Sequence, residues 1–247
     1  GLDGEPRLDG SYGRSQNLGA ASRARPPRLM VELGRAGCLL VHAAPGEAPP
    51  AACGPAHTLG VGKVAAAVRL HRLLAEHGAA VRFVLLCGVA GAYPERHRSS
   101  PPRVAPGNVC VVGQDGFGDE GVLTESGFWD FGRAGPQGPA FLDAGPFALD
   151  AELAAAAAAR LGVPIVAGTT VSTCSGAESL SAAVCTRLGA DVETMEGAAA
   201  AFVCREFGVP LLQVRAISNW TGDRARGAWD FAGAMRALHA ALVRLVG

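Results

Sequence analysis

The chain has 247 residues, of which 49% are hydrophobic and 18% charged, a composition typical of a folded globular protein. Its formal net charge is zero, which argues against nucleic acid or an anionic membrane as a partner. No apolar run is long enough to span a bilayer, and the first residues lack the apolar core of a signal peptide, so we expect a cytoplasmic protein without a membrane partner.

The cysteines and histidines do not signal a metal site. The seven cysteines are scattered and contain no C-x-x-C pair, and the six histidines contain no H-x-x-x-H pair. We therefore expect reduced core thiols, no metal and no organic cofactor.

Two regions differ in composition. Residues 1–28 are rich in Gly, Arg and Pro and have no hydrophobic periodicity, which predicts a flexible tail. Residues 29–247 contain neither an internal repeat nor a linker, which favours a single domain.

From residue 38 onward, short apolar runs alternate with helical patterns. We predict strands over 38–44, 81–87, 107–113, 164–173, 191–194 and 209–218. We predict helices after Gly62 within 57–78, and over 150–162, 177–189, 195–208 and 230–246, with Asp150 as an N-cap and Gly162 as a stop signal. This alternation predicts an α/β fold in which a mainly parallel sheet is covered by helices on both faces.

Ligands of such folds bind at the carboxyl ends of the strands. The candidates there are Glu47, a predicted turn at Gly88–Gly91, Thr173–Gly176, Glu193–Glu196, and Ser218–Asn219. We expect the substrate to contact Thr173 among them.

The segment GVGK (60–63) is similar to a phosphate-binding loop but does not match the sequence pattern of one. His57 occupies the position of the first glycine, and Val64 follows the lysine where Ser or Thr is required. A tight turn that leads into a helix is the better interpretation. Lys63, the only lysine, is explained by a general preference for arginine.

The acidic segment 115–128 lacks the spacing of a calcium loop. It is either a lid near a pocket or a solvated loop, and the sequence does not separate these alternatives.

The segment DVETMEGAAAAF (191–202) carries two glutamates, Glu193 and Glu196, into an apolar, alanine-rich stretch. An acid in the first turn of a helix is favoured by the helix dipole, which would explain one of them without any function. The small residues that follow allow the backbone to approach a neighbouring helix or a ligand.

The longer segment VETMEGAAAAFVCREFGVPLLQVRAISN (192–219) resembles the signature of the purine nucleosidase and phosphorylase superfamily. GVGKVAAA (60–67) and GVAGA (88–92) stand in the order and at the spacing of that superfamily, and the similarity extends over residues 38–247. The resemblance implies a nucleoside phosphorylase-like α/β fold with a central mixed, twisted sheet flanked by helices, and a homo-oligomer.

The resemblance also implies roles for individual residues. Glu196 would accept hydrogen bonds from the ribose hydroxyls and stabilise positive charge on the sugar, with Met195 as the apolar wall below it. Ala90 and Gly91 would line the base with their backbone. Glu47 would position and deprotonate the attacking water, although its surroundings, HAAPGEA, are less acidic than is usual in the family.

Asn219 would bind the purine at N7 and at its 6-substituent, and it points toward a 6-oxo purine. The expected reaction is hydrolysis of the N-ribosyl bond of a purine nucleoside. The alternatives are a methylthioadenosine/adenosylhomocysteine nucleosidase, a purine nucleoside phosphorylase, and a non-catalytic nucleoside-binding protein. A phosphorylase needs an arginine-rich phosphate cradle, and neither the 60–63 nor the 88–91 segment contains arginine.

Overall fold

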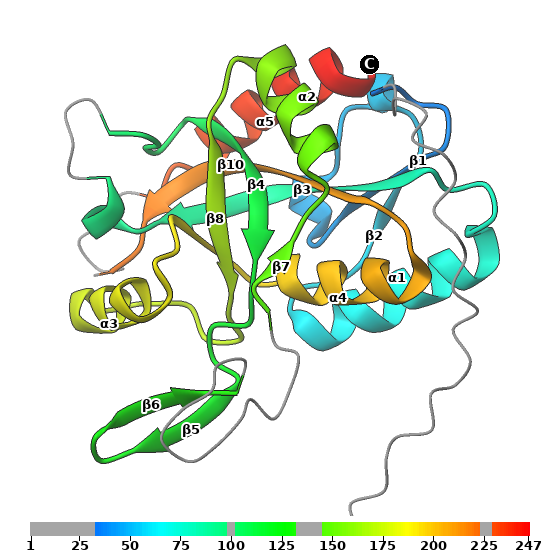
Figure 1. Ribbon diagram of the computed structural model, residues 1–247. Helices are drawn as coiled ribbons and strands as arrows, with labels where there is room; N and C mark the ends of the chain where they lie inside the picture. Colours follow the sequence, from blue (N-terminus) through cyan, green and yellow to red (C-terminus); the bar gives the residue numbers. More distant parts are fainter. Residues whose placement is uncertain (1–32, 98–101, 132–144, 223–228) are drawn as a thin grey trace, which may run out of the picture.

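The computed structural model describes residues 33–97, 102–131, 145–222 and 229–247 (Figure 1). The predicted tail, residues 1–28, lies outside the described part of the chain.

An eight-stranded mixed sheet forms the centre of the molecule (Figure 1). Its strands are β1 (Cys38–His42), β2 (Ala56–Thr58), β3 (Phe83–Ala92), β4 (Val109–Asp115), β7 (Phe147–Ala148), β8 (Ile165–Thr170), β9 (Val192–Thr194) and β10 (Leu211–Trp220). The main path is β10-β4-β8-β9-β3-β1-β2, and β10 also pairs with β3. This additional pairing closes β3, β10, β4, β8 and β9 into a ring, from which β1 and β2 extend on the side of β3. The predicted mixed, twisted sheet is confirmed.

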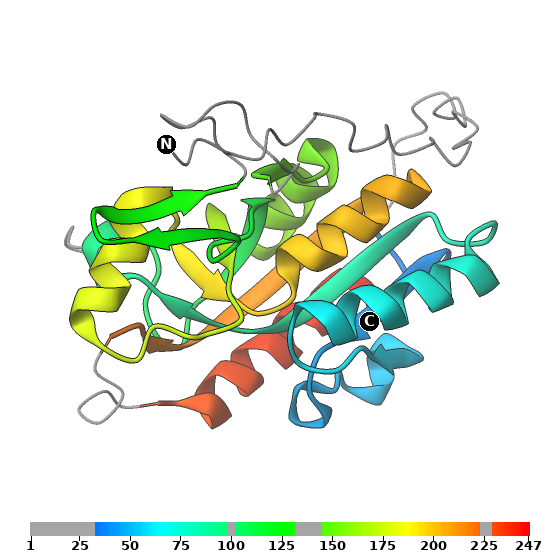
Figure 2. The same ribbon diagram turned by 90° about the horizontal axis from the view of Figure 1, so that it is seen from below.

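The two faces of the sheet are separately covered by helices (Figures 1 and 2). On β3, Val84 and Leu86 belong to one apolar cluster, whereas Leu85 and Cys87 belong to another, as the alternation of side chains along a strand requires. The first cluster includes residues of α1 (Lys63–His77) and α4 (Gly197–Phe207), and the second includes residues of α2 (Ala151–Leu161) and α5 (Phe231–Val246).

The remaining helix, α3 (Glu178–Leu188), packs beside Tyr93 at the end of the ring. Among the described helices, none combines the length and the apolar character that a membrane span requires.

The predicted signals at the ends of α2 are confirmed. The Asp150 carboxylate accepts hydrogen bonds from the backbone N–H groups of Glu152 and Leu153, and Gly162 adopts the left-handed conformation that ends the helix.

The predicted turn at Gly88–Gly91 is wrong. These residues continue β3, which pairs with β10 in parallel from Val84 to Ala92. Glycines usually indicate turns, but in this strand they leave space for side chains of neighbouring strands.

Both alternatives for the acidic segment were incomplete, because part of it forms a hairpin. Its strands are β5 (Gly121–Thr124) and β6 (Gly127–Asp130), which pair with each other in an antiparallel sheet separate from the main one. Figure 2 shows this hairpin beside α3.

Candidate active site

The sheet itself brings the predicted residues together. Gly91 on β3 pairs with Glu193 of β9 on one side and with Asn219 of β10 on the other. The positions predicted at the ends of three separate strands therefore meet at one end of the ring. Glu193 lies next to Met195 and Glu196, which connect β9 to α4.

Glu47 lies in a short 3-10 helix (Pro45–Glu47) directly after β1 and is buried. Its Oε2 accepts a hydrogen bond from the backbone N–H of Ala44 at 3.0 Å, and its Oε1 accepts one from Val89 on β3 at 2.8 Å. Two backbone donors therefore fix the carboxylate, and each oxygen keeps further lone pairs for another donor.

Glu196 is also buried, at the N-terminal end of α4. Its side chain does not cap its own helix, as a purely structural acid would. Instead, Oε1 accepts a hydrogen bond of 2.9 Å from the backbone N–H of Gly62, at the N-terminus of α1. Burial raises the pKa of Glu196, and the nearby Glu47 carboxylate adds to this effect, whereas Arg215 and the Gly62 N–H oppose it.

Arg215 is the cation that pairs with Glu196. It is fully buried on β10, and its Nη1 lies 3.9 Å from Glu196 Oε2. Nη2 donates to Gln213 Oε1 at 3.4 Å, whereas Nε and Nη1 have no hydrogen-bond partner among the described residues. A buried donor without a partner destabilises the folded protein. Nε and Nη1 would therefore gain from a hydrogen bond to a bound water or substrate.

Gly88 allows these groups to approach one another. An added Cβ at this position would lie 2.7 Å from both Arg215 Nη1 and Glu47 Oε1. The glycine in the middle of β3 therefore leaves the space in which a guanidinium and a carboxylate face each other.

Glu193 has a different role from Glu196. Its carboxylate accepts hydrogen bonds from the Tyr93 hydroxyl at 2.7 Å, from the Ser175 hydroxyl at 2.6 Å and from the Ser175 N–H at 2.9 Å. These donors hold the loop that follows β8. Of the two glutamates in the 191–202 segment, Glu193 positions the loop and Glu196 faces Arg215.

The other predicted contact residues lie around this centre. Asn219 is half-buried next to Gly91; its Oδ1 accepts from the Ser218 hydroxyl at 2.8 Å, and its Nδ2 donates to the Trp220 carbonyl at 2.8 Å. Ala90 is buried in β3 and Met195 is half-buried. Thr173 is exposed on the β8–α3 loop that Glu193 holds through Ser175.

Lys63 has a structural partner that the sequence did not reveal. Its Nζ forms ion pairs with Asp119 and Glu120, and Asp119 also accepts a hydrogen bond from the N–H of Ser172. The acidic segment thus ties the start of α1 to the β8–α3 loop on either side of the site.

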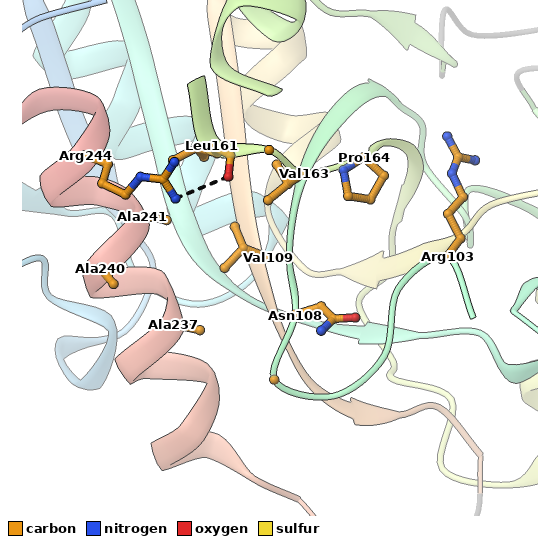
Figure 3. A pocket seen from close by; sticks show the side chains of 12 residues that line it. Arg103, Asn108, Val109, Leu161, Val163, Pro164, Ala237, Ala240, Ala241 and Arg244 are labelled. Atoms are coloured by element: carbon orange, nitrogen blue, oxygen red, sulfur yellow. Dashed lines mark hydrogen bonds between the residues drawn. The ribbon is translucent and has the colours of Figure 1, made fainter. Parts of the chain in front are cut away.

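A cavity of about 420 Å³ lies elsewhere (Figure 3). It is a groove between α5 and the segment after α2, and Arg244 at its edge donates hydrogen bonds to the carbonyls of Leu161 and Arg160. It contains none of the residues of the acidic pair. Within the described ranges, no cluster of three or more His, Cys, Asp or Glu is placed to hold a metal ion.

This fold and the buried pair of acids at the carboxyl end of its strands define a class. Residues 29–246 match the Phosphorylase superfamily, and the chain belongs to this family. It is a nucleoside N-glycosyl hydrolase, as predicted.

Two relatives are futalosine hydrolases. The chain is 34% identical to that of Thermus thermophilus over 193 residues, which cover 76% of this chain and 78% of the relative. It is 30% identical to that of Streptomyces coelicolor over 162 residues, which cover 66% of this chain and 64% of the relative.

The solved structures that resemble the chain have the same fold at low sequence identity. Native futalosine hydrolase of Helicobacter pylori has a TM-score of 0.64 at 18% identity, covering 85% of this chain and 94% of that one. A methylthioadenosine/adenosylhomocysteine nucleosidase of Colwellia psychrerythraea, in complex with adenine, has a TM-score of 0.62 at 20% identity, covering 87% and 93%.

Replacement of Gly88 by Ala tests the assembly of the site. The added methyl group would displace Arg215 or Glu47, because it lies within contact distance of both. We expect a loss of nucleosidase activity on the order of a hundredfold or more, together with a stability loss of roughly 1–3 kcal/mol typical of overpacking. Turnover and urea unfolding measure the two effects, and Gly113→Ala, whose Cβ would meet a core side chain on β8, serves as the control for overpacking alone. Equal activity of the two variants would contradict the assignment.

Proposed function

We propose that the chain hydrolyses the N-ribosyl bond of futalosine and releases hypoxanthine and dehypoxanthine futalosine, a step of menaquinone biosynthesis. The observation that carries the proposal is the buried cluster of Glu47, Arg215 and Glu196 beside Gly88 of β3. The two futalosine hydrolase relatives support the choice of substrate.

Cleavage of an N-ribosyl bond builds positive charge on the sugar. Glu196 is held by the Gly62 N–H and lies in a buried environment, where a carboxylate stabilises a developing cation more strongly than it would in water. In this role its Oε2, on the side of Arg215, accepts hydrogen bonds from the ribose hydroxyls. Because such a contact strengthens as charge develops, it favours the transition state over the bound substrate.

Glu47 is the general base in this mechanism. A water between its carboxylate and the unpartnered donors of Arg215 would be oriented by both and would lose its proton to Glu47 as it attacks the sugar. Val89 N–H and Ala44 N–H keep the carboxylate from rotating away.

The same region favours water over phosphate as the nucleophile. A phosphate site needs free cations or free backbone N–H groups. In the 60–63 segment the Gly62 N–H is used by Glu196 and Lys63 is neutralised by Asp119 and Glu120, which leaves the single guanidinium of Arg215 in place of an arginine-rich phosphate cradle. This supports a hydrolase over a phosphorylase. A non-catalytic binding protein would not need a second buried carboxylate at the position of Glu47.

Glu196→Gln is expected to keep the fold and to lose turnover by a factor of about a hundred to a thousand, because a neutral amide cannot offset charge on the sugar. Release of hypoxanthine from futalosine measures the loss. The matched control is Glu206→Gln, which changes an exposed acid on the same helix that pairs with Arg205. Near-normal turnover of folded Glu196→Gln would reduce Glu196 to a structural link between α1 and α4.

Glu47→Gln is expected to lower the hydrolysis rate by roughly a hundredfold or more while ligand affinity survives, because the amide cannot accept the proton of water. Circular dichroism and product binding are measured in parallel with the rate. Rate and affinity lost together with secondary structure would show that Glu47 is structural and that another group activates the water.

Asn219→Asp tests the choice of base. An amide can donate to O6 or N7 of a 6-oxo purine, whereas an ionised carboxylate would face the oxygen with like polarity. We expect slower hydrolysis of futalosine and a relative shift toward its 6-amino analogue, aminodeoxyfutalosine. The ratio of the two rates, measured with and without phosphate, decides the matter. An unchanged ratio would remove Asn219 from base recognition.

A further inference from the structure

A row of hydrogen-bonded polar side chains lies behind the active site, on the apolar face of the sheet that α4 covers. Asp115, at the end of β4, is fully buried, and its Oδ2 accepts a hydrogen bond from Gln213 Nε2 at 3.1 Å. Gln213 is also fully buried, and its Oε1 accepts from Arg215 Nη2 at 3.4 Å. These hydrogen bonds therefore link a carboxylate that does not face the site to the guanidinium that does.

Two neighbouring elements accommodate these hydrogen-bonded side chains. Thr170 of β8 donates its hydroxyl to Asp115 Oδ1 at 2.9 Å and accepts from the N–H of Ala198 at the start of α4. Gly197 precedes Ala198, and a Cβ there would lie 1.9 Å from Asp115 Oδ2 and 2.6 Å from Gln213 Oε1. The N-terminus of α4 therefore contains a glycine where this pair of side chains needs the space.

The direction of the Gln213 amide decides what Arg215 meets. A carboxylate at Asp115 only accepts hydrogen bonds, so it attracts Nε2 and turns Oε1 toward the guanidinium. With a hydroxyl donor at Asp115 Oδ2, the amide would be favoured in the reverse direction and would place its NH₂ against the guanidinium, donor against donor.

We propose that Asp115 is a positioning residue for the hydrolysis: through Gln213 it holds the Arg215 guanidinium between Glu47 and Glu196. The expected effect of Asp115 on the reaction rate rests on the proposed function, whereas the hydrogen bonds that place Arg215 do not depend on it. Asp115 is too deep to touch the substrate and acts on the reaction only through Arg215.

The unfavourable burial of the Asp115 carboxylate supports this role. Burial raises its pKa from 3.8 to about 6, although Gln213, Thr170, the Gly116 N–H and the charge of Arg215 all lower it. Arg215 on β10 is the charged side chain that acts on it, since β8 and α4 present a hydroxyl and backbone groups. Between pH 3.8 and about 6 the folded state binds a proton that the unfolded state has lost, so stability falls as pH rises and the cost is complete above about pH 6. A carboxylate that destabilises the fold at neutral pH is typical of a functional position.

The first experiment compares kcat and KM for futalosine in the wild type, Asp115→Asn and Gln213→Met at pH 8 and pH 5. We expect both variants to lower kcat at pH 8 on the order of tenfold with little change in KM, because the sugar and base contacts remain. At pH 5 the ratio of wild type to Asp115→Asn should approach one, because the wild-type carboxyl is then itself protonated. A ratio that stays constant between these pH values, or full kcat of Asp115→Asn at pH 8, would overturn the proposal.

Asp191→Asn is the matched control. Asp191 is another buried carboxylate of the sheet, held by the Ala167 N–H and by Arg96 and Arg103, and it has no contact with Gln213 or Arg215. We expect lower thermal stability and a kcat within about twofold of the wild type at both pH values. An equal loss of kcat in Asp191→Asn would reduce Asp115 to a structural residue.

Thermal unfolding gives a readout that does not need activity. Asp115→Asn should melt at a higher temperature than the wild type at pH 8, and the difference should vanish near pH 4. In a Gln213→Met background, the pH at which half of this difference is lost should move upward, because the carboxylate has lost a donor. A wild type that releases no base from any nucleoside would refute the proposed function alone, whereas an unmoved midpoint would refute the link between Asp115 and Gln213.

Discussion

The burial of the Arg215 guanidinium is the constraint on which the rest of the structure depends. Arg215 carries its charge into the interior of the protein, where an unpaired ion would cost several kcal/mol. The surrounding groups reduce this cost: Glu196 pairs with the guanidinium on the side of the site, and Gln213 links it to Asp115 behind. The position of each of these acids is therefore tied to the position of one cation.

The backbone provides the geometry that the side chains need. Gly88 and Gly197 leave space where a Cβ would collide with the polar cluster, and the N–H groups of Ala44, Val89 and Gly62 fix the two carboxylates. Backbone groups of a packed sheet and of helix ends move little. The carboxylates are consequently preorganised, so the protein does not have to reorganise when charge develops on the substrate.

Much of the fold could be predicted from the sequence because its signals are local. The strand–helix alternation, the Asp150 cap and the Gly162 stop each depend on a few neighbouring residues. The Gly88–Gly91 segment was mispredicted because glycine indicates a turn and a close approach equally well. Glu47, Glu196 and Asn219 could be listed as candidates from their positions at strand ends, but their individual roles could be proposed only through the family signature. Gln213 and Arg215 were missed, although polar residues at alternate positions of a strand as apolar as 209–218 are a usable signal. Asp115 has no such signal, because its partner Gln213 is 98 residues away in the chain.

The contact between Glu196 and the Gly62 N–H joins residues 134 positions apart. Both lie at helix N-termini, so α1 and α4 must be docked side by side before the carboxylate reaches its place. Contacts of such sequence separation form late, since the entropy of closing a long loop is lost before the contact can compensate for it. The active centre is thus a product of complete folding, and a chain that has regained only its helices and strands has no sugar-binding acid in position. For this molecule, recovery of catalysis after denaturation reports native packing, whereas recovery of helical circular dichroism does not.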